Sequence, residues 1–134
     1  MSIYLDASAF LKLYLKEPDS DRAEDILLGG GEWVTGRHTT IEVRRNLSRY
    51  LGGADLAAAQ RQFQHDWTNT AVVDLTEEVC EAAAQLAEIT GVRSLDALHL
   101  GAAQVIGGGR LPLVTFDLRQ AQAARTLGWT VIGS

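Results

Sequence analysis

Four acidic residues that are far apart in the sequence occupy similar local positions. Asp6, Glu42, Asp96 and Asp117 each lie where a predicted apolar strand gives way to a helix, or in the first turn of a predicted helix. In an α/β sheet such positions gather at the carboxyl ends of the strands, where ligands bind. Four carboxylates brought together there would repel one another unless a hard cation lay among them. The pattern therefore predicts a site for Mg²⁺ or Mn²⁺.

Each acid also has an ordinary structural explanation. Asp and Glu favour the first turn of a helix, because its free N–H groups and the helix dipole stabilise negative charge. Asp117 could serve only as an N-cap, and Glu42 only as a first-turn charge. Asp6 is harder to explain in this way, since Ser8 is the better cap and would leave the Asp6 carboxylate free. A metal site is favoured because all four acids begin helices at one end of the predicted sheet.

Three polar residues near the acids are candidates for contacts with the ion, its waters or a substrate. Ser8 and Thr115 each lie two residues from an acid. Asn46 lies one helical turn beyond Glu42 on the same face, where it could orient Glu42 or contact a substrate. Each also has an ordinary explanation: Ser8 could cap its helix, Thr115 could be a β-branched strand residue, and Asn46 could be a solvent-exposed amide.

The histidines and the single cysteine are predicted to have structural or surface roles. His99 follows Asp96 by three residues and shares its helical face, so a carboxylate–imidazole metal site is conceivable, but the surrounding leucines favour a structural histidine. His38 and His65 have polar neighbours and are expected on the surface. Cys80 has no paired base in the sequence and is expected to be a small buried side chain.

The segments that must position these residues alternate between short apolar strands and helices. Strands separated by helices indicate parallel pairing with helices on both faces of the sheet. No repeat, low-complexity tract or linker divides the chain, so residues 1–134 are expected to form a single domain. The predicted strands are 2–5, 32–35, 71–75, 111–115 and 129–132; the predicted helices are 7–15, 22–28, 39 or 40 to 52, 55–67, 76–91, 94–107 and one from 117 onward.

Composition narrows the classes of function. With 134 residues, 46% apolar and 22% charged, the chain has the size and composition of a soluble globular domain. One cysteine excludes an internal disulfide and a cysteine-based zinc site, which favours a reducing cytoplasm. The opening apolar residues lack the basic leader of a signal peptide, and no apolar run reaches the ~18 residues of a membrane-spanning helix.

The net charge of -5 argues against a protein that coats nucleic acid by charge alone, but the charge is unevenly distributed. Between residues 37 and 50, four arginines accompany a single acid, Glu42. A basic strip beside an acidic pocket suits an anionic substrate, although a solvated helix face would have the same pattern. The four residues of this strip are Arg37, Arg44, Arg45 and Arg49.

Five segments, taken in order, form a recognisable set. They are Tyr4-Leu5-Asp6-Ala7-Ser8, Lys12-Leu13-Tyr14 followed by Glu17, Glu42 in its arginine-rich helix, Ser94-Leu95-Asp96-Ala97-Leu98-His99-Leu100 and Leu113-Val114-Thr115-Phe116-Asp117. The D-x-S start and the L-D-A-L-H-L segment are specific when they occur together in this order and spacing. Over nearly its whole length the chain resembles PIN-domain ribonucleases, and specifically the VapC toxins of type II toxin–antitoxin systems.

The resemblance implies a PIN-like (Rossmann-like) three-layer α/β/α sandwich with a central parallel sheet. It implies Mg²⁺- or Mn²⁺-dependent endonucleolytic hydrolysis of RNA phosphodiester bonds. It also implies a cognate VapB-type antitoxin that neutralises the toxin, a homodimer and a toxin–antitoxin hetero-oligomer. Position by position, the family's acidic places fall on Asp6, Glu42, Asp96 and Asp117, with Ser8 and Thr115 beside them. The first, third and fourth acids would hold the cation, and Glu42 would bind a second ion or steer the attacking water.

Two other classes of function fit a small α/β domain with acids at its strand ends. A phospho-acceptor receiver-like domain should carry a lysine at the end of a late strand, but no lysine follows Lys16. A non-catalytic binding module would use its acids only as caps. Partner binding is suggested by residues 10–15 and 26–28, which are apolar enough to form either a groove for an amphipathic helix or helices buried in the core.

Overall fold

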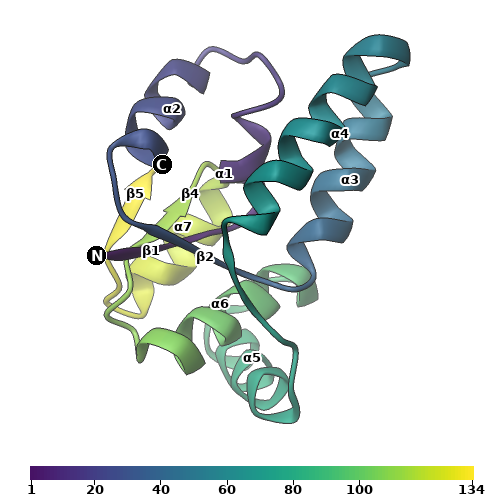
Figure 1. Ribbon diagram of the computed structural model, residues 1–134. Helices are drawn as coiled ribbons and strands as arrows, with labels where there is room; N and C mark the ends of the chain where they lie inside the picture. Colours follow the sequence, from purple (N-terminus) through teal and green to yellow (C-terminus); the bar gives the residue numbers. More distant parts are fainter.

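Five parallel strands form the centre of the structure, a computed structural model that describes residues 1–134 (Figure 1). The strands lie in the order β3-β2-β1-β4-β5. Their bounds are Ser2–Leu5 for β1, Glu32–Gly36 for β2, Ala71–Val73 for β3, Leu113–Thr115 for β4 and Val131–Gly133 for β5. The all-parallel sheet confirms the predicted α/β class.

Seven helices connect and cover the strands. Most begin and end within one turn of their predicted bounds. Thr76 and Gly91 delimit α5 as predicted, because the Thr76 hydroxyl accepts from the Val79 N–H and Gly91 takes up the left-handed conformation at a φ of 75°. The helices are α1 (Ala7–Leu11), α2 (Ser20–Leu28), α3 (Thr39–Tyr50), α4 (Gly53–Thr68), α5 (Glu77–Thr90), α6 (Ser94–Gly107) and α7 (Leu118–Thr126).

The sheet is the middle layer of three. Side chains of β1 alternate between its two faces, as the pleat of a strand requires. Ile3 and Leu5 pack into a core with residues of α1, α2, α3 and α4, whereas Tyr4 packs into a second core with residues of α5, α6 and α7. Figure 1 shows α5 and α6 on the opposite side of the strands from α3 and α4. This arrangement confirms the α/β/α sandwich.

The strand order fixes where a ligand site should lie. The neighbours of β1 are β2 on one side and β4 on the other, so the direction of winding reverses between β1 and β4. Ligands of such sheets bind outside the carboxyl ends of the strands at this reversal. Asp6 follows β1 directly and Asp117 follows β4 by two residues. The same strand order excludes the receiver-like alternative, whose sheet has the order 2-1-3-4-5.

Two local predictions are wrong. The first helix ends at Leu11 rather than Leu15, because the chain tightens into turns in which the N–H groups of Leu13 and Tyr14 bond three residues back. Cys80 is exposed rather than buried. The buried face of α5 contains Val79, Ala83 and Leu86, and Cys80 lies about 100° around the helix from Val79.

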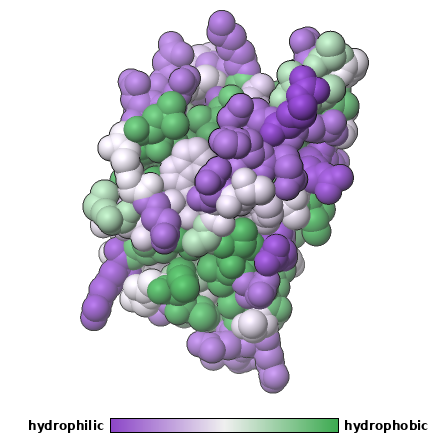
Figure 2. Space-filling model, in the orientation of Figure 1, coloured by the Kyte–Doolittle hydropathy of each residue, from purple (hydrophilic) through white to green (hydrophobic).

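Hydrophobic side chains also remain on the surface. Figure 2 shows hydrophobic patches among hydrophilic side chains on the face that it draws. Ile41, Leu95 and Leu118 are all exposed, and each adjoins one of the four acids in the sequence.

No helix has both the length and the apolar character needed to cross a bilayer.

Candidate active site

Asp6 lies at the reversal of the sheet with its carboxylate almost fully enclosed. It is 3% exposed. Its Oδ1 accepts from the Ser8 hydroxyl at 2.6 Å and the Ala9 N–H at 3.1 Å, and its Oδ2 accepts from the Thr115 hydroxyl at 2.5 Å. Thr115 reaches Asp6 because β1 and β4 pair in register, with Leu5 opposite Val114. Burial nevertheless raises the pKa of Asp6, although His99 and these hydrogen bonds oppose the rise.

The prediction that Ser8 caps the first helix and leaves the Asp6 carboxylate free is wrong. Asp6 is itself the N-cap of α1, and Ser8 does not cap that helix. The Ser8 hydroxyl instead donates to Asp6 and accepts from the N–H of Phe116 at 2.8 Å. Ser8 therefore ties the end of β1 to the loop that carries Asp117.

All four predicted acids line a single cavity of about 160 Å³. They reach it from four separate elements, so the predicted convergence of the carboxylates is present in the fold. Ser8, Asn46 and His99 also line this cavity. Asn46 donates to the backbone carbonyl of Glu42 at 2.8 Å, so its amide contacts the helix backbone beside the acid rather than the carboxylate itself.

Burial and mutual repulsion disfavour the charged forms of acids that line the cavity. Asp96, in the first turn of α6, has its pKa raised to about 6 by burial and then by the charges of Asp117 and Glu42. The pKa of Glu42 is raised to about 7, mainly by burial. Asp117 caps α7, where its Oδ1 accepts from the N–H groups of Arg119 and Gln120. Asp6 and Asp117 thus each cap a helix and also line the cavity.

A buried polar chain runs from the sheet to Glu42. The Tyr4 hydroxyl lies 2.8 Å from Nδ1 of His99, and Nε2 of His99 lies 2.7 Å from Oε1 of Glu42. Burial lowers the pKa of His99 to about 4, so the ring is neutral near pH 7. With Nδ1 accepting from Tyr4, Nε2–H donates to Glu42. His99 is buried as expected of a structural histidine, but it also orients a candidate catalytic acid.

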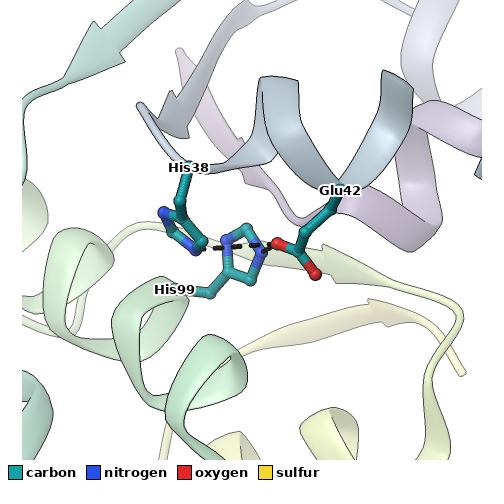
Figure 3. Close-up of side chains that lie close together, drawn as sticks. All are labelled: His38, Glu42 and His99. Carbon is teal, nitrogen blue, oxygen red and sulfur yellow. Dashed lines mark hydrogen bonds and ion pairs between the residues drawn. The ribbon is translucent and has the colours of Figure 1, made fainter. Parts of the chain in front are cut away.

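His38 was expected on the surface and is instead 3% exposed. Its ring lies 4.0 Å from that of His99 between centroids, and its Nε2 is 3.7 Å from Oε1 of Glu42 (Figure 3). The expectation that the histidines do not cluster is therefore wrong for these two, while His65 is exposed as predicted. His38 follows the end of β2 by two residues, so the criterion that selected the acids would also have selected it.

The cavity suits a hard divalent cation. Carboxylate oxygens are the ligands that Mg²⁺ and Mn²⁺ prefer, and a cation would relieve the repulsion by Asp117 and Glu42 that, after burial, raises the pKa of Asp96. The four carboxylates are spread around the cavity. The tightest group of potential ligand atoms is instead formed by His38, Glu42 and His99, whose atoms lie within 4.8 Å of one another.

The family model described as PIN domain matches residues 3–126. The chain belongs to the PIN-domain family. A curated relative, Ribonuclease VapC45 of Mycobacterium tuberculosis, is 33% identical to this PIN domain over 134 residues, which cover 96% of this chain and 93% of the relative. The predicted resemblance to VapC proteins is thereby confirmed.

Solved structures agree with the fold of this PIN domain. The crystal structure of VapC20 from Mycobacterium tuberculosis, a sarcin-ricin loop cleaving toxin, aligns with a TM-score of 0.74 at 20% identity, covering 91% of this chain and 95% of that one. A toxin–antitoxin complex from Klebsiella pneumoniae aligns with a TM-score of 0.67 at 16% identity, covering 87% of each chain. At these identities the likeness concerns the fold.

Proposed function

We propose that this PIN domain is an endoribonuclease toxin that requires Mg²⁺ or Mn²⁺ and is neutralised by a cognate antitoxin. The observation that carries the proposal is the convergence of Asp6, Glu42, Asp96 and Asp117 on one cavity at the reversal of the sheet. The curated relative at 33% identity, named as a ribonuclease, supports RNA as the substrate.

The four acids would have different roles in catalysis. Asp6, Asp96 and Asp117 would hold the cation, and Glu42 would steer the attacking water. When bound, the cation supplies neutralisation of the charge that grows on the phosphoryl oxygens and lowers the pKa of water. Glu42 is suited to accept a proton, because its pKa of about 7 is close to neutral pH and His99 fixes one of its oxygens.

Exposed arginines flank the cavity and would bind the RNA backbone. Arg93 and Arg119 line a cleft of about 410 Å³ that also includes Asp96. On α3, Arg44, Arg45 and Arg49 are exposed on the helix that carries Glu42. The fourth member of the predicted basic strip, Arg37, is paired with Asp74 at 2.9 Å and so is less available. Arginine suits this role because its guanidinium binds phosphate oxygens in pairs.

An antitoxin helix would dock in a groove of about 640 Å³ beside the acidic cavity. The groove includes Leu11, Leu15, Leu51 and Phe116, and it shares Ser8, Leu11 and Asn46 with the acidic cavity. The second wall of this groove comes from α3 and Leu51, not from residues 26–28 as the sequence suggested. A bound segment would therefore reach the active site. Leu15→Glu should abolish binding of the cognate antitoxin and leave RNA cleavage intact.

Incubation of the purified protein with total RNA tests the proposed activity. Wild type, Asp6→Asn and the control Asp25→Asn are compared with Mg²⁺ and with EDTA; Asp25 is exposed on α2 and does not line the acidic cavity. We expect cleavage only with Mg²⁺ and a rate at least about 100-fold lower for Asp6→Asn, because one cation ligand is lost.

Circular dichroism of each variant separates loss of activity from loss of fold. A folded Asp6→Asn protein that cleaves like wild type would contradict the proposed site. A folded wild-type protein that leaves all RNA intact in Mg²⁺ and in Mn²⁺ would instead favour a non-catalytic binding module.

A further inference from the structure

His38, Glu42 and His99 form a compact group of two imidazoles and one carboxylate, of which Glu42 and His99 line the acidic cavity. Their potential ligand atoms all lie within 4.8 Å of one another. Figure 3 shows the three side chains pointing toward one another from α6, from α3 and from the residue before α3. Two nitrogen donors and one oxygen donor make a ligand set different from the all-oxygen set of the four acids.

The burial of the His38 ring also points to a bound ligand. The side chain is 3% exposed, and neither ring nitrogen makes a well-formed hydrogen bond, although the ring lies near the backbone carbonyl of Leu95. Buried polar groups in folded proteins are nearly always hydrogen-bonded, so an orphaned imidazole needs an explanation. The ring aims its Nε2 at Glu42, at 3.7 Å from Oε1. An ion between these atoms would satisfy it.

The surroundings hold the group in place. A Cβ added at Gly36 would lie 2.6 Å from Cε1 of His38 and 3.0 Å from the Tyr4 hydroxyl, so only glycine leaves room for the ring. Tyr4 contacts the far nitrogen of His99 at 2.8 Å. A histidine that ligates a metal donates its other ring N–H to such an outer partner. Binding of the ion would therefore change the tautomer of His99, so that Nδ1–H donates to the Tyr4 oxygen and the lone pair of Nε2, which otherwise carries the proton donated to Glu42, faces the ion.

We propose that His38, Glu42 and His99 bind one transition-metal ion of the Zn²⁺ class at a site that adjoins the hard-cation site and shares Glu42 with it. Imidazole nitrogens suit Zn²⁺, and Mg²⁺ prefers oxygen ligands. Zinc bound to nitrogen and oxygen at ~2.0–2.2 Å keeps its tetrahedral ligands ~3.3 Å apart. The observed separations of 2.7 Å and 3.7 Å from Glu42 Oε1 bracket that value, so small side-chain movements suffice.

Glu42 belongs to both sites, so a bound Zn²⁺ ion also affects RNA cleavage. An ion held by the two histidines withdraws Glu42 from the acidic cavity, so Zn²⁺ inhibits RNA cleavage even in excess Mg²⁺. This inhibition rests on the proposed nuclease activity, whereas the binding itself does not. The two claims therefore fail separately.

Binding is measured without RNA. Untagged, metal-stripped protein in excess Mg²⁺ is titrated with Zn²⁺ by calorimetry, and with Co²⁺ while its visible absorption is recorded. We expect one equivalent to bind, and binding about 10- to 100-fold weaker for His38→Asn. The control His65→Asn removes an exposed histidine and should bind like wild type. Equal affinity of His38→Asn and wild type, or displacement of Zn²⁺ by Mg²⁺, would overturn the proposal.

A second measurement needs no variant and covers the case in which His38→Asn does not fold. In wild-type protein labelled with ¹⁵N-histidine, Zn²⁺ should shift one ring nitrogen of each of two histidines and leave the third histidine unchanged. Shifts confined to one histidine, or absent from all three, would contradict the site. If Zn²⁺ binds in this way but the protein cleaves no RNA, the metal site stands and the nuclease proposal fails.

Discussion

Nε2 of His99 lies 2.7 Å from Oε1 of Glu42, which joins a buried residue of α6 to an acid of α3 that lines the active-site cavity. The other ring nitrogen is held by Tyr4 from the central strand. Through this chain the sheet fixes the orientation of Glu42. His99 is thus a positioning residue, with no need to contact the substrate.

Replacing His99 tests this positioning role. His99→Phe preserves most of the buried volume but removes the donor to Glu42, so we expect Mg²⁺-dependent cleavage to fall by about 10- to 100-fold. His99→Gln keeps an amide donor and should recover most of the activity. The measurement is the single-turnover rate of RNA cleavage. Equal losses in the two variants would show that His99 matters only for packing.

Thr115 provides a second test, at the other side of Asp6. Its hydroxyl donates to Asp6 Oδ2 and accepts from the N–H of Asp117 at 3.1 Å. Thr115→Val removes both bonds at constant shape, and we expect the free energy of unfolding to fall by about 1–3 kcal/mol. Thr115→Ser retains the hydroxyl and should stay close to wild type. Urea denaturation measures the difference, and a Thr115→Val protein as stable as wild type would contradict the assigned bonds.

Asp96 should make the metal-free protein less stable as the pH rises. Its pKa is about 6 in the folded state, above the ordinary value of 3.8. Between these values the folded state binds more protons than the unfolded state, so this contribution to stability is complete below about pH 4 and is lost as the pH rises through 6. Asp96 is partly solvated, so we expect Asp96→Asn to gain only about 1 kcal/mol at about pH 8 and nothing at about pH 4.

Thermal or urea unfolding of the two proteins in EDTA, at both pH values, measures this gain. The buried histidines act in the opposite direction, since the pKa of His38 and of His99 is lowered to about 4. The comparison with Asp96→Asn cancels their contribution. A variant that is destabilised at about pH 8 would show that the Asp96 carboxylate is stabilised rather than strained in the folded state.

The rate of cleavage should depend on pH in the same range. Glu42 and Asp96, with pKa values of about 7 and about 6, are protonated at low pH and cannot then serve a cation. We therefore expect the rate to rise between about pH 5.5 and pH 8. Because Mg²⁺ competes with protons for the carboxylates, more Mg²⁺ should move the midpoint to lower pH. A midpoint that ignores the Mg²⁺ concentration would contradict this competition.

Much of the fold could be predicted because its signals are local. Thr76 and Gly91 mark the ends of α5 by capping chemistry, and Asp117 marks the start of α7 in the same way. Convergence of the acids followed from strand-to-helix order alone, since a parallel sheet brings the carboxyl ends of its strands together. The exposure of Cys80 could also have been predicted from the sequence, because this residue lies off the buried face of its helix.

What the sequence did not reveal depends on distant contacts. His38 has polar neighbours in the chain, yet the ring of His99, far away in the sequence, packs against it, and Gly36 leaves it room. Asp6 was expected to leave its capping role to Ser8, but the pairing of β1 with β4 brings Thr115 and the loop after it close enough to use Ser8 differently. Such roles are set by strand register across the sheet rather than by any nearby pattern.

The ends that cleavage leaves on RNA test the central claim most directly. Products made by wild-type protein in Mg²⁺, with folded Asp6→Asn protein as the control, are mapped for their terminal groups. Water attack assisted by a cation at the four acids should leave a 5′-phosphate and a 3′-hydroxyl, and Asp6→Asn should leave the RNA intact. A 2′,3′-cyclic phosphate, formed equally by wild type in EDTA, would contradict the account.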